Sequence, residues 1–172
     1  MHEYTQLAYD SIKHYLERGK TMDEPEKLSP ELKENRAGVF VSIHGKVNHS
    51  LRGCIGTFMP TQKNIASEII ENAISAATKD PRFMPLTVDE LEDIEVNVDV
   101  LSEPKDCKVE DLDPKKFGVI VKTEDGRKGL LLPDLEGIDT VEKQLEIACS
   151  KAGIDHENDE FSVMKFSVKR YV

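Results

Sequence analysis

The chain has 172 residues, enough for one domain with a sizeable hydrophobic core. Acidic residues outnumber basic residues by 33 to 23 and give a formal net charge of −10 at pH 7, which disfavours broad electrostatic binding to nucleic acid or to an anionic membrane. No apolar stretch is long enough to span a membrane and the N-terminus lacks the pattern of a signal peptide, so we expect a soluble, cytoplasmic protein.

A helix and a β-hairpin are predicted in the first part of the chain. Apolar residues recur at helical spacing from Tyr4 to Leu16, and Gly19 is a typical C-terminal stop. In residues 39–44, valine or isoleucine alternates with other side chains, and this period of two predicts a strand. A turn leads from this strand into residues 51–58. This last stretch is expected to form the second strand of the hairpin.

A helix, a stiff turn and a third strand are predicted next. Isoleucines and alanines share one face of a helix over residues 65–77, and so many small side chains allow close approach to the sheet. Two prolines stiffen the turn over residues 80–86. Thr87 and Glu90 have the spacing of a capping box that begins a short helix. Residues 94–101 alternate as a strand with one polar face, which is either solvated or lines a pocket.

The second half of the chain predicts another hairpin, a helix and a final strand. Residues 117–122 and 128–132 are strand-like, and the Glu-Asp-Gly sequence between them is typical of a hairpin turn. Residues 140–153 have the cap, the spacing and the glycine stop of a helix, and residues 161–172 alternate as a strand. The chain mixes hairpins and helices and has no regular series of βαβ units. This order predicts an α+β fold, with a largely antiparallel sheet flanked by helices.

The main candidate site lies in residues 51–58. Gly53 and Gly56 remove side chains on either side of Cys54, so that a ligand or another backbone can approach closely. Arg52 is a cation that can favour the thiolate form of this cysteine, which makes Cys54 a candidate catalytic nucleophile or redox thiol. The alternative is a buried structural thiol that fills space between the two glycines.

Asp80 and Arg82 follow the second helix and are candidates to complete this site. With Arg52 they would form a ligand-binding site for a carboxylate or phosphate group. The alternative is a set of internal ion pairs, in which Asp80 braces the turn and Arg52 pairs with Asp80, Glu95 or Asp99. We favour the structural ion pair for Asp80, and the sequence leaves the partner of Arg52 open.

Neither a metal site nor a particular cofactor is indicated. His44 and His49 lie in the hairpin beside the candidate site. We expect both to be exposed to solvent in the turn rather than to act as hydrogen-bond partners of the Cys54 thiol. Cys54, Cys107 and Cys149 lie far apart, so the sequence indicates reduced thiols rather than a disulfide framework or a zinc site.

The same stretches carry a family resemblance. Leu-Arg-Gly-Cys-Ile-Gly over residues 51–56 resembles the signature of the AMMECR1 domain family, and residues 76–83 resemble its second block. The similarity continues in order through further blocks of the chain. One departure is Met84-Pro85, where the family usually has two prolines.

The resemblance implies a single AMMECR1-like domain over residues 1–172 with two unequal lobes, of which part has been likened to RAGNYA domains that include nucleotide and nucleic acid binders. Bacterial and archaeal members are often encoded beside a Memo-like protein and a radical SAM protein, in the so-called AmmeMemoRadiSam system. These two proteins are therefore the partners that the resemblance implies.

The sequence is compatible with two main functions. A third hypothesis is that the signature residues only pack the fold and bind nothing. The favoured one is an accessory or binding module with a pocket at the signature strand, because no acid–base set accompanies Cys54. The alternative is a cysteine-dependent enzyme in which Cys54 reacts while Arg52 and Arg82 hold a small anionic or nucleotide-like substrate.

Overall fold

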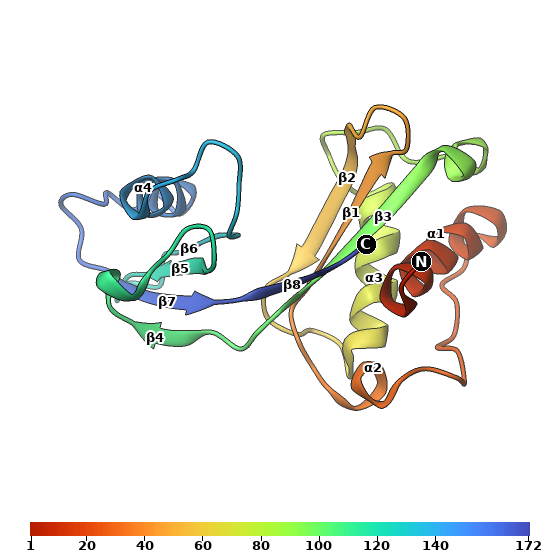
Figure 1. Ribbon diagram of the computed structural model, residues 1–172, viewed down its shortest axis with the longest axis horizontal. Coiled ribbons are helices and arrows are strands. Elements are labelled where there is room, and N and C mark those ends of the chain that lie inside the picture. The colour runs from red at the N-terminus through yellow and green to blue at the C-terminus, as the bar shows by residue number, and fades with distance from the viewer. The chain divides into compact units, whose positions relative to one another are not determined.

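A computed structural model describes residues 1–172, which divide into two compact units. The first unit consists of residues 1–101 and 169–172, and the second of residues 102–168. Each unit contains one four-stranded antiparallel sheet with helices, as Figure 1 shows. The predicted α+β class is confirmed, and the strands form two sheets. None of the helices combines the length and the hydropathy that crossing a membrane requires.

The first unit orders its strands β2-β1-β3-β8, so β2 lies at an edge of the sheet. The predicted hairpin, helices and capping box are present, and Gly19 ends the first helix with a positive φ of 68°. Its elements are α1 (Glu3–Arg18), α2 (Pro30–Glu34), β1 (Val39–Gly45), β2 (Leu51–Thr57), α3 (Ile65–Thr78), the 3-10 helix η1 (Val88–Asp93), β3 (Ile94–Leu101) and β8 (Val168–Tyr171).

The two faces of this sheet differ in character. Helices α1 and α3 lie together on one side of β1 and β3 (Figure 1), where alternate strand residues such as Val41 and Val98 are fully buried. The opposite face carries polar side chains, including Ser42 and Asn97, which are direct partners across β1 and β3. The sequence therefore predicted the alternation of β3 correctly, because one face packs on helices and the other does not.

The second unit orders its strands β4-β7-β5-β6 and packs α4 against them through a separate apolar core. The final strand predicted over residues 161–172 is interrupted at Ser167, and its halves β7 and β8 join different sheets. The elements are β4 (Lys105–Cys107), the 3-10 helix η2 (Val109–Asp111), β5 (Gly118–Lys122), β6 (Lys128–Leu131), α4 (Val141–Lys151) and β7 (Ser162–Phe166).

Candidate functional site

The two glycines of the signature strand allow close packing within the first unit. A Cβ atom on Gly53 would lie 2.2 Å from the carbonyl oxygen of Ala76 in α3, and one on Gly56 would lie 2.2 Å from the ring of Phe40. Any side chain would therefore push α3 or the ring away. Each glycine has a packing role, and ligand binding by Gly53 and Gly56 stays a prediction.

Cys54 lies opposite Ser42 on the polar face of the sheet. Its side chain is half-buried, and burial raises the pKa of the Cys54 thiol. Asp99 and Asp80 raise this pKa further, while the charge of Arg82 opposes the rise. A raised pKa keeps the thiol protonated at neutral pH, whereas an activated nucleophile needs the thiolate. The activation that the sequence suggested is therefore outweighed by burial.

Asp80 and Arg82 bind the backbone of Cys54 at the edge of the sheet. The N–H of Cys54 donates to Asp80 Oδ2 at 2.9 Å, and Arg82 Nη2 donates to the Cys54 carbonyl oxygen at 3.4 Å. Because β2 is an edge strand, these backbone groups point away from β1 and would otherwise lack a strand partner. We call this arrangement of Asp80, Arg82 and the Cys54 backbone the edge clip.

The two side chains of the edge clip also hold each other. Arg82 Nε lies 3.0 Å from Asp80 Oδ1, and Arg82 Nη2 lies 2.8 Å from Asp80 Oδ2. These hydrogen bonds, with those from the backbone N–H groups of Cys54 and Arg82, hold the pKa of Asp80 well below its usual range. The side chain of Asp80 is 2% exposed and that of Arg82 is 57% exposed. The favoured structural role of Asp80 thus has a specific partner set.

Arg52 pairs with Glu90, a residue that the sequence did not indicate as its partner. Arg52 Nε lies 2.9 Å from Glu90 Oε1 and Nη2 lies 3.1 Å from Oε2. Arg52 Nη1 also donates to the carbonyl oxygen of Met84 at 2.6 Å, and Nη2 to that of Pro85 at 3.4 Å. Of the three partners considered for Arg52, none is the one found.

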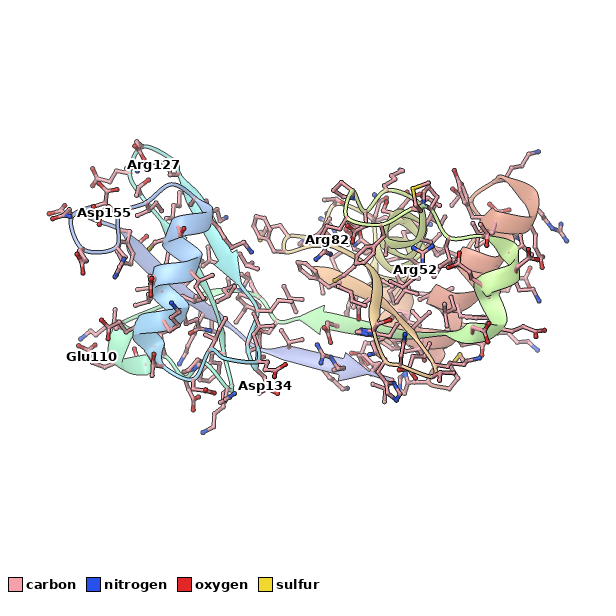
Figure 2. The ribbon with its side chains drawn as sticks, turned by 90° about the horizontal axis from the view of Figure 1, so that it is seen from above. Arg52, Arg82, Glu110, Arg127, Asp134 and Asp155 are labelled. Atoms are coloured by element: carbon pink, nitrogen blue, oxygen red, sulfur yellow. The ribbon has the colours of Figure 1, made fainter.

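A bulge in β2 explains where Arg52 points. Ile43 of β1 lies opposite Gly53, and the next residue, His44, lies opposite Leu51, so Arg52 has no residue opposite it on β1. Such a bulge interrupts the alternation of side chains along the strand. Figure 2 shows Arg52 and Arg82, both on the first unit, and the two arginines hold the two ends of the segment that follows α3.

This segment forms an exposed apolar turn, residues 81–85, which we call the 81–85 turn. Met84 is 80% exposed, and Pro81 and Pro85 are exposed as well. Phe83 is half-buried, with the Arg82 guanidinium 5.4 Å from its ring centre. Polar contacts therefore fix both ends of an exposed turn that contains two prolines, a phenylalanine and a methionine.

Glu68 is a structural residue that the sequence reading missed. It lies on α3 with 1% exposure and accepts hydrogen bonds from Thr61 N, Thr61 Oγ1 and Gln62 N at 2.8, 2.8 and 2.7 Å. Thr57 at the end of β2 donates to it as well. A single carboxylate within the apolar face of a helix was the signal, because a buried charge needs such partners.

The histidines of the hairpin do not contact the thiol. His49 Nδ1 lies 2.9 Å from Glu95 Oε1 in a pair whose side chains are 73% and 42% exposed, and His44 Nδ1 lies 3.2 Å from the carbonyl oxygen of His49. No group of three or more His, Cys, Asp or Glu side chains is arranged to hold a metal ion.

Comparisons with known proteins agree with this architecture. The AMMECR1 family model matches residues 5–171. A protein of Thermotoga maritima is 52% identical over 171 residues, covering 99% of this chain and 97% of its own length. A protein of Clostridium acetobutylicum is 51% identical over 98% of this chain, a match that covers 35% of its own length. The crystal structure of protein PH0010 from Pyrococcus horikoshii is 32% identical, with a TM-score of 0.85 over 97% of this chain and 88% of that one.

Proposed function

This chain belongs to the AMMECR1 family, and we propose that it is an accessory protein-binding module whose signature strand presents the 81–85 turn to a partner. The observation that carries this proposal is the set of hydrogen bonds from Arg52 to the carbonyl oxygens of Met84 and Pro85. They tie the signature strand to an exposed apolar segment.

A fixed apolar turn has the properties of a docking element. Methionine and aromatic side chains are enriched in protein interfaces, and exposed apolar groups that gather on a surface commonly mark an interaction site. The edge clip at one end and Arg52 at the other order the backbone before any partner binds. Binding then costs less conformational entropy than it would with a loose loop.

The state of the three charged or reactive side chains favours binding over catalysis. Arg52 and Arg82 each pair with an internal carboxylate, Glu90 and Asp80. Burial raises the pKa of the Cys54 thiol. A cysteine nucleophile needs a base or a cation that produces the thiolate, and the cations here already serve the fold.

We propose the Memo-like protein and the radical SAM protein as the partners, since the family resemblance implies both. Most of the length of the Clostridium relative lies outside the match to this chain. In that protein, a region similar to this chain is part of a longer polypeptide.

Titration of the full-length protein with each purified partner from the same genome tests the proposal. Met84→Asp places a charge on the 81–85 turn while keeping the carbonyl oxygen that binds Arg52, and we expect it to weaken binding by at least about tenfold. Val47→Asp is the matched control, because Val47 is 91% exposed in the turn between β1 and β2. Equal losses in both variants, or no binding of either partner to the wild type, would overturn the proposal.

A second candidate function is a cysteine-dependent enzyme acting on a small anionic or nucleotide-like substrate. Its supporting observation is that the Cys54 thiol is only half-buried and that Arg82 opposes the rise in its pKa. The exposed side of the Arg82 guanidinium would receive the anion, beside Asp80 and the glycines of the strand. Loss of a partner-dependent reaction in Cys54→Ser, with partner binding unchanged, would favour this function.

A further inference from the structure

The second unit contains a hollow whose lining combines basic and aromatic side chains. Among its residues are two lysines, two phenylalanines and one carboxylate, namely Lys105, Lys165, Phe117, Phe166 and Glu103. We call it the lysine hollow. The two lysines come from β4 and β7, which run side by side in Figure 1. None of these residues belongs to the signature strand or to the 81–85 turn.

The two lysines repel each other across the sheet. Lys105 and Lys165 are direct partners in the antiparallel pair of β4 and β7. Side chains that are directly opposite have Cβ atoms about 4.5–5.5 Å apart, and like charges in such a pair are destabilising. The free protein therefore keeps two positive charges together at some cost to its stability.

Neither lysine forms an ion pair with a neighbouring carboxylate. The Nζ atom of Lys165 lies 4.5 Å from the centre of the Phe117 ring and 3.4 Å from the carbonyl oxygen of Asp111. Lys105 is exposed and forms no ion pair. Glu103 is the single carboxylate in the lining.

A second pair of opposite lysines in the same unit provides a contrast. Lys122 and Lys128 are direct partners across β5 and β6. The hollow that Lys122 lines also contains Glu124 and Glu160, so two carboxylates offset the positive charge there. The lysine hollow differs because one carboxylate accompanies two lysines, in a chain whose net charge is −10.

We propose that the lysine hollow binds a small organic anion, a phosphate or carboxylate group carried on an apolar or aromatic body. An oxyanion between the two ammonium groups removes their repulsion and accepts hydrogen bonds from both. The half-buried ring of Phe117 provides apolar contact for the rest of the ligand, whereas Phe166 is only 2% exposed. Ser102 Oγ accepts from the N–H of Ser167 at 2.9 Å, which leaves its hydroxyl proton available to donate to the anion.

Nuclear magnetic resonance titration of the full-length protein tests this site with phenyl phosphate, benzoate and inorganic phosphate as separate probes. We expect saturable shifts at the amides of Lys105, Phe117 and Lys165, with a dissociation constant below about 1 mM for at least one aromatic anion. Comparing phenyl phosphate with benzoate separates phosphate from carboxylate recognition. Inorganic phosphate binding as well as phenyl phosphate would show that no apolar contact contributes, and would overturn that part of the proposal.

Three variants decide whether the lysines carry the binding. Lys105→Met and Lys165→Met should each weaken it by about tenfold or more, since each removes a hydrogen bond between charged groups. Lys105→Arg should retain most of it. Lys122→Met, in the other lysine pair, should leave it unchanged, and amide spectra verify that each variant is folded. Unchanged affinity in Lys105→Met and Lys165→Met, or an equal loss in Lys122→Met, would overturn the site.

Discussion

Arg52 and Glu90, which are 38 positions apart in the sequence, form a two-pronged ion pair with N···O distances of 2.9 and 3.1 Å. Glu90 Oε2 also accepts from the N–H and the hydroxyl of Thr87, at 2.9 and 3.1 Å, and so closes the capping box of η1. The hydrogen bonds with Arg52 and Thr87 lower the pKa of Glu90. The Glu90 carboxylate therefore links the signature strand to the start of η1, the short helix that follows the 81–85 turn in the sequence.

Arg52→Lys should destabilise the protein and loosen the 81–85 turn. A lysine cannot make the two parallel bonds to Glu90 while also reaching the carbonyl oxygens of Met84 and Pro85. We expect a loss of about 1–2 kcal/mol in the free energy of unfolding, a modest value because the Arg52 and Glu90 side chains are 24% and 36% exposed. Urea denaturation measures this loss.

Arg18→Lys is the control for that substitution, because Arg18 is an exposed residue in the last turn of α1. Hydrogen exchange adds a local readout at Leu86, whose N–H donates to the carbonyl oxygen of Ala77 at 2.7 Å. Exchange at Leu86 should accelerate in Arg52→Lys and not in Arg18→Lys. Equal stability losses in the two variants would contradict a specific role for Arg52.

Asp80→Asn should cost about 1–3 kcal/mol at pH 7, because it removes the charge that Arg82 and the Cys54 N–H both use. The pKa of Asp80 in the folded protein lies well below its usual value of 3.8. The stabilisation by its charge is therefore fully present above that value and is lost as the pH falls towards the folded pKa. The stability difference between wild type and variant should begin to shrink below about pH 4 and continue to shrink as the pH falls, and a constant gap would contradict this account.

Gly53→Ala should be more disruptive than a comparable substitution elsewhere in the same sheet. Its Cβ would meet a backbone oxygen of α3 at 2.2 Å, and α3 cannot move without disturbing the core. We expect a loss of about 1–3 kcal/mol, which is typical of overpacking. Gly45→Ala is the control, because its Cβ would meet the movable side chain of Asn48 at 2.6 Å. Similar unfolding midpoints for the two variants would argue against close packing at Gly53.

Local patterns predicted the elements of this fold well. The stop at Gly19, the hairpin that carries residues 51–57 and the capping box of Thr87 and Glu90 depend on neighbours a few positions away, and all are present. The break at Ser167 was missed, because alternation continues through it while the two halves join different sheets. Which sheet a strand joins is decided by contacts far away in the sequence.

The sequence predicted that the candidate residues lie near one another, but it did not predict their contacts. Asp80 and Arg82 were expected near the signature strand, and the structure brings them to the backbone of Cys54. The partner of Arg52 depends on a bulge, and no local pattern around Arg52 reveals that bulge. The sequence explained Glu90 as part of a helix cap, and nothing in the sequence indicated its ion pair with Arg52.

Cys54 should react slowly with thiol reagents at neutral pH. Burial raises its pKa above the usual value of 9.0, so labelling followed by peptide mass spectrometry should show a rate that still increases above about pH 9. Arg82→Met removes the charge that opposes this rise, and should move the labelling profile to higher pH. Glu95→Gln serves as the control, because Glu95 pairs with His49 in the same unit. Labelling of the wild type at about pH 6 as fast as at about pH 9 would show that the thiolate is stabilised, and would favour the enzyme over the binding module.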